Sequence, residues 1–152
     1  MNGGAPDRDQ AVRAWVEREW NAPSVFQRRR ELPPEDEDLW LALGVTGDDG
    51  WEFIEEFGEA FGVDMTPFLW YFHGEEEGWN LGAVLSRPPN RRVERIPITL
   101  RLLGEAVQNG RWPVAYPPHR LPAVRSDMIF NQAIFVGFAL LCFAALIAAS
   151  IG

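Results

Sequence analysis

The chain has 152 residues, of which 47% are hydrophobic and 24% are charged, so it has the composition of a folded protein with room for one modest domain and appendages. Its formal net charge is −8, and residues 31–86 hold 15 of the 22 acidic residues and no basic ones. Nucleic acid is therefore not an expected partner, because a phosphate backbone requires a basic face.

Residue types and motifs exclude several kinds of chemistry. All 14 basic residues are arginine, which excludes Schiff bases formed on lysine. The single cysteine, Cys142, lies in an apolar run and forms no intrachain disulfide. The sequence contains no phosphate-binding glycine loop, no Gly-x-Ser-x-Gly nucleophile motif, no zinc-protease helix and no metal-spaced cysteine set. We therefore expect no enzyme activity, with no catalytic residue, no metal site and no cofactor.

The first predicted helix covers residues 7–20. It ends at Asn21-Ala22-Pro23, which cannot continue a helix. The next segment carries Arg28-Arg29-Arg30, which is interpreted as a solvated loop or as a contact for lipid headgroups or an acidic partner. The apolar stripe of the helix consists of residues at helical spacing: Val12, Trp15, Val16 and Trp20.

The second predicted helix lies between Asp49 and Gly62. Asp49 is its expected N-cap, with Glu52 completing a capping-box-like pair, and Gly62 supplies the stop. Trp51 is expected to fill the core together with Trp15. One face is apolar and predicted to be buried, with Phe53, Ile54, Phe57 and Phe61; another is acidic, with Glu52, Glu55, Glu56 and Glu59. The acidic face could bind a partner or could simply be solvated.

Residues 68–78 are predicted to form a short aromatic helical turn that packs on the core. His73, next to three glutamates, is a weak metal pattern and is expected in a solvated turn. A loop rich in proline and arginine then leads to a helix that begins after Thr99, a suitable N-cap, and ends at Asn109-Gly110. Its apolar positions are Leu100, Leu103 and Val107.

Residues 128–152 carry no charge and are nearly all apolar. About 20 such residues, at ~1.5 Å rise each, span the ~30 Å hydrocarbon layer of a membrane. Arg111, Arg120 and Arg125 precede this span and nothing basic follows it, which predicts a cytoplasmic N-terminal side. No secretory signal is visible in the first 20 residues, so we expect a single-pass tail anchor in the cytoplasmic (inner) membrane.

The expected fold is therefore mainly all-α. Residues 1–112 form a small helical bundle in the cytosol, residues 113–127 form a proline-rich linker, and residues 128–152 form the transmembrane helix.

Three stretches carry a resemblance to a known family. Leu43-Gly44-Val45-Thr46-Gly47-Asp48 falls on a carrier loop that reads Leu-Gly-x-Asp-Ser-Leu, Glu59-Ala60-Phe61-Gly62 falls on the end of the following helix, and residues 98–112 fall on a last helix. In order and spacing the chain resembles the acyl carrier protein family, and more closely a family of small bacterial domains of unknown function related to those carriers.

The resemblance breaks at the attachment residue. A carrier's serine holds a phosphopantetheine arm, whereas Gly47 has no nucleophile and Thr46 lies one residue away. The resemblance implies a carrier-like domain without the arm, with Thr46 as the alternative site of attachment. Because a carrier docks its acidic second helix on basic enzyme surfaces, it also implies a protein partner with a basic surface, bound through Asp48, Asp49, Glu52, Glu55, Glu56 and Glu59.

The expected function is thus a membrane-tethered, non-catalytic protein that binds a partner through its acidic helix. Two alternatives remain. One is an acyl carrier modified at Thr46, and the other is a small subunit of a membrane complex that acts mainly through its transmembrane helix.

Overall fold

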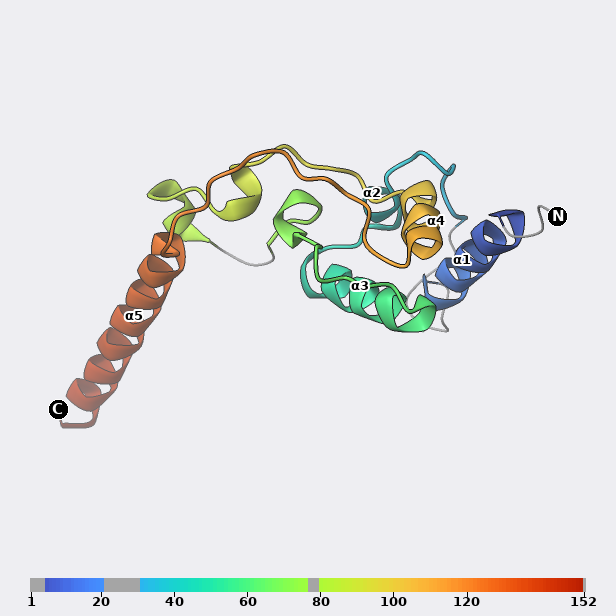
Figure 1. The fold of residues 1–152 in the computed structure, drawn as a ribbon. Coiled ribbons are helices and arrows are strands. Elements are labelled where there is room, and N and C mark those ends of the chain that lie inside the picture. Colours follow the sequence, from blue (N-terminus) through green and yellow to red (C-terminus); the bar gives the residue numbers. More distant parts are fainter. Residues whose placement is uncertain (1–4, 21–30, 77–79, 152) are drawn as a thin grey trace. The chain divides into compact units, whose positions relative to one another are not determined.

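The structure is a computed structural model that describes residues 5–20, 31–76 and 80–151 (Figure 1). In these residues the chain forms helices joined by turns and irregular segments. Asn21 to Arg30, with the arginine triplet, lie outside the described residues. The elements are α1 (Ala5–Trp20), α2 (Leu39–Leu43), α3 (Gly47–Phe61), η1 (Trp70–Phe72), η2 (Leu81–Val84), η3 (Pro89–Arg91), α4 (Leu100–Asn109) and α5 (Ser126–Ile151). The predicted mainly helical class is confirmed, with one long apolar helix at the C-terminal end.

The chain divides into two units. The first comprises residues 1–77 and 94–118, and the second comprises residues 78–93 and 119–152. The first unit therefore includes α1, α2, α3, η1 and α4, and the second includes η2, η3 and α5. The proline-rich stretch is divided between them, since residues 113–118 belong to the first unit and residues 119–127 to the second.

The core of the first unit is built by the apolar stripes read from the sequence. Val12, Trp15 and Val16 of α1 are buried, and α1 lies beside α4 (Figure 1). The Trp15 ring meets Phe53 and Phe57 of α3 at centroid distances of 5.2 and 5.8 Å. Buried aromatic rings in such tilted or edge contacts combine a large apolar area with a defined geometry.

The short helix α2 is held by Trp40. Asp38 caps it, because its side chain accepts a hydrogen bond from the Leu41 amide at 3.1 Å. The buried Trp40 ring fits between two backbones, since a Cβ atom on either Gly50 or Gly74 would come within 3.0 Å of it. Local sequence patterns do not predict this helix, because α2 has only five residues and no amphipathic repeat.

Helix α4 follows its predicted signals. The Thr99 side chain accepts from the Leu102 amide at 3.1 Å, and Gly110 ends the helix in the left-handed conformation with a φ of 64°. Beyond it, Asp64 and Arg111 form an isolated parallel bridge, in which the Trp112 amide donates to the Asp64 carbonyl oxygen at 3.0 Å. This bridge ties the chain after α4 to the chain after α3.

In the second unit, α5 is the one described helix that is long and apolar enough to cross a membrane, over residues 126–150. It begins two residues earlier than predicted and carries a buried carboxylate, Asp127, in its first turn. The short η2 helix packs against its N-terminal turns.

Candidate functional site

The acidic face of α3 is fully presented to solvent. All six predicted partner-binding carboxylates, those of Asp48, Asp49, Glu52, Glu55, Glu56 and Glu59, are exposed. The helix can hold them there because its opposite face is buried through Phe53, Ile54 and Phe57. Within the described chain, none of the six forms an ion pair with an arginine: the observed pairs involve other acidic residues.

Trp51 lies on this acidic face and not in the core. Half of its side chain (50%) is exposed, so the prediction that it fills the core was wrong. Its ring is nevertheless supported on one side by Phe68, at a centroid distance of 6.3 Å. Because residues three and four apart are neighbours on a helix, Trp51 lies between Asp48 and Glu55. The result is an apolar ring at the edge of the acidic face, with exposed carboxylates beside it on α3.

The loop before α3 has an unusual backbone. Gly44 ends α2 with a φ of 72°, and Gly47 begins α3 with a φ of 49°, both in the left-handed region. Thr46, exposed and extended, is the N-cap residue, although its side chain makes no capping hydrogen bond. The predicted N-cap, Asp49, instead lies in the first turn, where its charge suits the positive end of the helix dipole. The helix starts earlier than predicted because Gly47 allows a tight turn.

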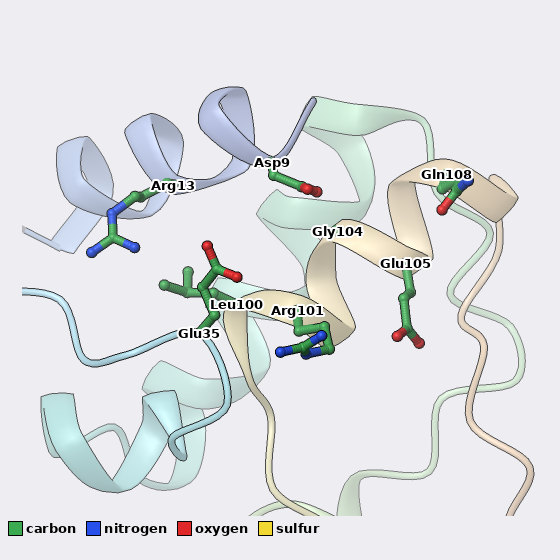
Figure 2. A pocket seen from close by; sticks show the side chains of 8 residues that line it. All are labelled: Asp9, Arg13, Glu35, Leu100, Arg101, Gly104, Glu105 and Gln108. Carbon is green, nitrogen blue, oxygen red and sulfur yellow. The ribbon is translucent and has the colours of Figure 1, made fainter. Parts of the chain in front are cut away.

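A small pocket of about 150 Å³ lies between α1, the segment before α2, and α4 (Figure 2). Asp9 and Arg13 reach it from α1, and Glu35 comes from the segment before α2. A Cβ atom on Gly104 would come within 2.6 Å of the Asp9 carboxylate, so this glycine leaves room for the Asp9 side chain. The lining has three carboxylates, those of Asp9, Glu35 and Glu105, and two guanidinium groups, those of Arg13 and Arg101.

His73 is fully buried, so its predicted place in a solvated turn was wrong. Its ring stacks on Phe68 at 4.9 Å, Nδ1 lies 2.8 Å from the Ile96 carbonyl oxygen, and Nε2 lies 2.7 Å from the Tyr116 hydroxyl. That hydroxyl already accepts from the Leu69 amide and from the Trp112 indole. It must therefore donate to Nε2, which makes the imidazole neutral with its proton on Nδ1.

The surroundings of His73 keep it uncharged. Burial away from water lowers its pKa to about 4, and the charge of Arg95 acts in the same direction, against the Ile96 hydrogen bond and the Asp38 charge. Burial also raises the pKa of Tyr116, which keeps its hydroxyl a donor. The aromatic residues clustered around His73 in the sequence are one sign of this network, but the partners Ile96 and Tyr116 are 23 and 43 residues away.

A second polar cluster joins η2 to the start of α5. Arg125 binds the Asp127 carboxylate through Nε at 2.9 Å and through Nη2 at 2.6 Å. Asn80 also donates to that carboxylate, at 3.0 Å, and accepts from Asn131 at 2.9 Å. Asn131 in turn accepts from the Gly82 amide at 2.8 Å. From the sequence only Arg125 of this cluster is singled out, for its charge before the apolar span, because Asn80 lies 47 residues from Asp127 and 51 residues from Asn131.

The described residues include no group of three histidine, cysteine, aspartate or glutamate side chains placed to hold a metal ion. Comparison of the chain with protein-family models, with curated proteins and with solved structures gives no match. The resemblance to acyl carriers therefore gains no support from relatives, and the function has to be argued from the two units themselves.

Proposed function

We propose that the chain is a non-catalytic adaptor, tethered to the cytoplasmic membrane by α5, that binds a basic protein partner through the exposed face of α3. The observation that carries the proposal is the position of Trp51. Its ring is half exposed and flanked by exposed carboxylates, and the opposite face of its helix is buried. Tryptophan is among the residues that dominate binding energy in interfaces, and a rim of charge steers and orients the partner.

The carboxylates support the same proposal. Glu52, Glu55, Glu56 and Glu59 are spaced so that like charges are neighbours along the helix, which destabilises it. No arginine of the described chain offsets this repulsion through an ion pair with them. A basic surface would relieve it, so binding energy comes from removing repulsion as well as from new contacts.

The tether rests on α5. Its 25 residues from Ser126 to Ser150 are long and apolar enough to cross the hydrocarbon layer, and no other described part of the second unit covers the side chains from Gln132 to Ser150. Arginine bias on the N-terminal side favours a cytoplasmic first unit. A partner bound at α3 would thereby be concentrated at the membrane surface.

The test is affinity capture with the full chain from detergent-solubilised membranes of the native cell, with the captured protein identified by mass spectrometry. We expect Trp51→Ala and the quadruple reversal of Glu52, Glu55, Glu56 and Glu59 to arginine each to abolish capture of one and the same protein. The matched control reverses four exposed glutamates elsewhere in the first unit, Glu37, Glu75, Glu94 and Glu105, and should retain it. Loss of capture in the control, or capture by the α3 variant, contradicts the proposal.

Modification at Thr46 is tested separately. The intact mass of the chain, measured after co-expression with a phosphopantetheinyl transferase, should be unchanged, because Gly47 supplies no hydroxyl and the Thr46 hydroxyl lies one residue away from the expected attachment position. An added arm that is lost in Thr46→Ala would replace the adaptor by an acyl carrier.

A further inference from the structure

The second unit holds its η2 segment against the first turns of α5. The backbones touch, because a Cβ atom on Gly82 would overlap the carbonyl oxygen of Asp127. The Gly82 amide donates to the Asn131 side chain at 2.8 Å, and Asn80 joins Asn131 to Asp127. Pro88 and Pro89 are also buried in the described structure. The η2 segment is thus fixed in place at the end of the apolar helix.

This fixed segment exposes apolar side chains. Val84 is 89% exposed and Leu85 67%, and Leu81 is exposed as well. The first turns of α5 expose Met128, Ile129 and Phe130. An open groove runs between the two elements, lined by Leu85, Ser86, Ser126, Ile129, Phe130 and Ala133. Apolar surface therefore continues from η2 onto the helix that could enter a membrane.

The charge of the second unit is the reverse of that of the whole chain. Its sequence has five arginines, Arg87, Arg91, Arg92, Arg120 and Arg125, and one acidic residue, Asp127, whereas the whole chain has a net charge of −8. Asp127 is buried and already bound by Arg125, so it offers no exposed negative charge. Arg87, Arg91 and Arg92 are exposed in the segment that follows η2.

Arg92 connects this charge to the groove. Its Nη2 donates to the hydroxyl of Ser86, a groove residue, at 3.3 Å, and its Nε donates to the Arg87 carbonyl oxygen at 2.6 Å. A guanidinium has five N–H donors, so these two bonds orient the group and leave donors for a ligand oxygen. Guanidinium groups match phosphate geometry well.

We propose that the second unit binds anionic phospholipid at the membrane interface. Leu81, Val84 and Leu85 enter the border of the acyl chains beside α5, and Arg87, Arg91 and Arg92 bind the headgroup phosphates. A bilayer is the occupant that fits because the apolar patch continues onto α5 and its rim is cationic, which are the two requirements of an interfacial anchor. The inference rests on the membrane tether of the proposed function, and not on the partner of α3.

The test uses the full chain in vesicles of phosphatidylcholine, with and without phosphatidylglycerol. Cys142 is replaced by alanine, Val84→Cys carries a nitroxide, and spin-label accessibility to oxygen and to a water-soluble nickel chelate gives its depth. We expect the label to be oxygen-accessible and nickel-protected when phosphatidylglycerol is present. Replacing Arg87, Arg91 and Arg92 by glutamine should lower the ratio of membrane-inserted to water-exposed label by roughly 100-fold. Each arginine near an anionic surface raises this ratio roughly fivefold.

The matched control removes three exposed arginines of the first unit, Arg8, Arg18 and Arg111, and should leave the depth of the label unchanged. The proposal is overturned if the label on Val84→Cys is accessible to the nickel chelate in both kinds of vesicle. It is also overturned if the depth of the label is the same with and without phosphatidylglycerol. Broadening that grows with protein density would show that a second copy covers the patch instead. A nitroxide on native Cys142 separates the failures: if that label lies outside the bilayer core, the tether itself is wrong.

Discussion

The guanidinium of Arg95 joins Asp38, the capping residue of α2, to the chain around His73. It pairs with the Asp38 carboxylate, to which Nη2 donates at 3.2 Å, and its Nε donates to the His73 carbonyl oxygen at 2.8 Å. The two side chains are largely withdrawn from water, with 32% and 12% exposed. The pair therefore connects the N-terminus of one helix to the turn that carries the buried histidine.

The first prediction follows from this geometry. Asp38→Ala removes the cap of α2 and leaves Arg95 without its partner, and we expect it to lower the free energy of unfolding by about 2 kcal/mol. Arg95→Lys should retain little of the stabilisation that Arg95 provides, because an ammonium cannot replace the guanidinium fork that reaches both acceptors. Urea unfolding of the full chain in detergent, followed by tryptophan fluorescence, measures both effects.

The matched control is the exposed pair of Arg101 and Asp36, whose atoms lie 2.5 and 2.7 Å apart. In double-mutant cycles, we expect a clearly larger coupling energy for Arg95 with Asp38 than for this pair, since solvent screens exposed ions. Equal coupling energies would show that burial adds nothing to the Arg95 pair.

The second prediction concerns acid stability. In the folded chain the pKa of His73 is about 4, below the value of 6.5 usual for an unfolded chain. Between these two pKa values the unfolded chain binds a proton that the folded chain excludes, so stability is present above pH 6.5 and is lost as the pH falls toward 4. From pH 6.5 to 4.5 the free energy of unfolding should drop by roughly 2 kcal/mol from this residue alone.

Urea midpoints measured across that pH range check this expectation. His73→Phe should flatten the pH dependence, whatever it does to stability at pH 7. Tyr116→Phe should destabilise the fold at every pH, because Leu69 and Trp112 would lose their acceptor. An equally steep pH profile in His73→Phe would assign the titration to another group.

Local patterns in the sequence predicted much of the first unit. Three members of the predicted stripe of α1, Val12, Trp15 and Val16, are buried, and the fourth, Trp20, has a side chain outside the described part of the chain. The cap Thr99 and the stops Gly62 and Gly110 are confirmed. Each depends on residues a few positions apart, where helical spacing and capping chemistry fix the outcome.

Contacts between distant segments could not be read in this way. Arg95 and Asp38 are 57 residues apart, and no spacing rule pairs them. Trp51 is apolar and lies two residues before the buried Phe53, yet its angle on α3 places it beside the carboxylates. His73 adjoins three glutamates in sequence, but three-dimensional packing against Phe68 and Tyr116 buries it. Burial of a polar side chain depends on partners that only the tertiary fold supplies.

The third prediction tests the join between η2 and α5. Gly82→Ala would place a Cβ atom against the Asp127 carbonyl oxygen, which is backbone and cannot move aside. We expect η2 to detach, so that amide exchange of residues 81–86 rises by roughly tenfold or more. Hydrogen exchange of the full chain in nanodiscs, read by mass spectrometry, measures it. Gly137→Ala, with open space around its Cβ, is the matched control, and equal exchange in the two variants would mean that η2 is not held by this contact.

The fourth prediction concerns Gly47, the first residue of α3. Its φ of 49° is left-handed, a conformation that costs a residue with a side chain about 1–2 kcal/mol. We therefore expect Gly47→Ser to lower the free energy of unfolding by about that amount, and Gly47→Asn to lower it less, because asparagine tolerates the left-handed region better than most residues. Thr46→Ser, at an extended neighbour with a φ of −141°, should change stability little. Urea unfolding compares the three variants under one set of conditions. If Gly47→Ser is as stable as the wild-type chain, the backbone at this position does not require glycine.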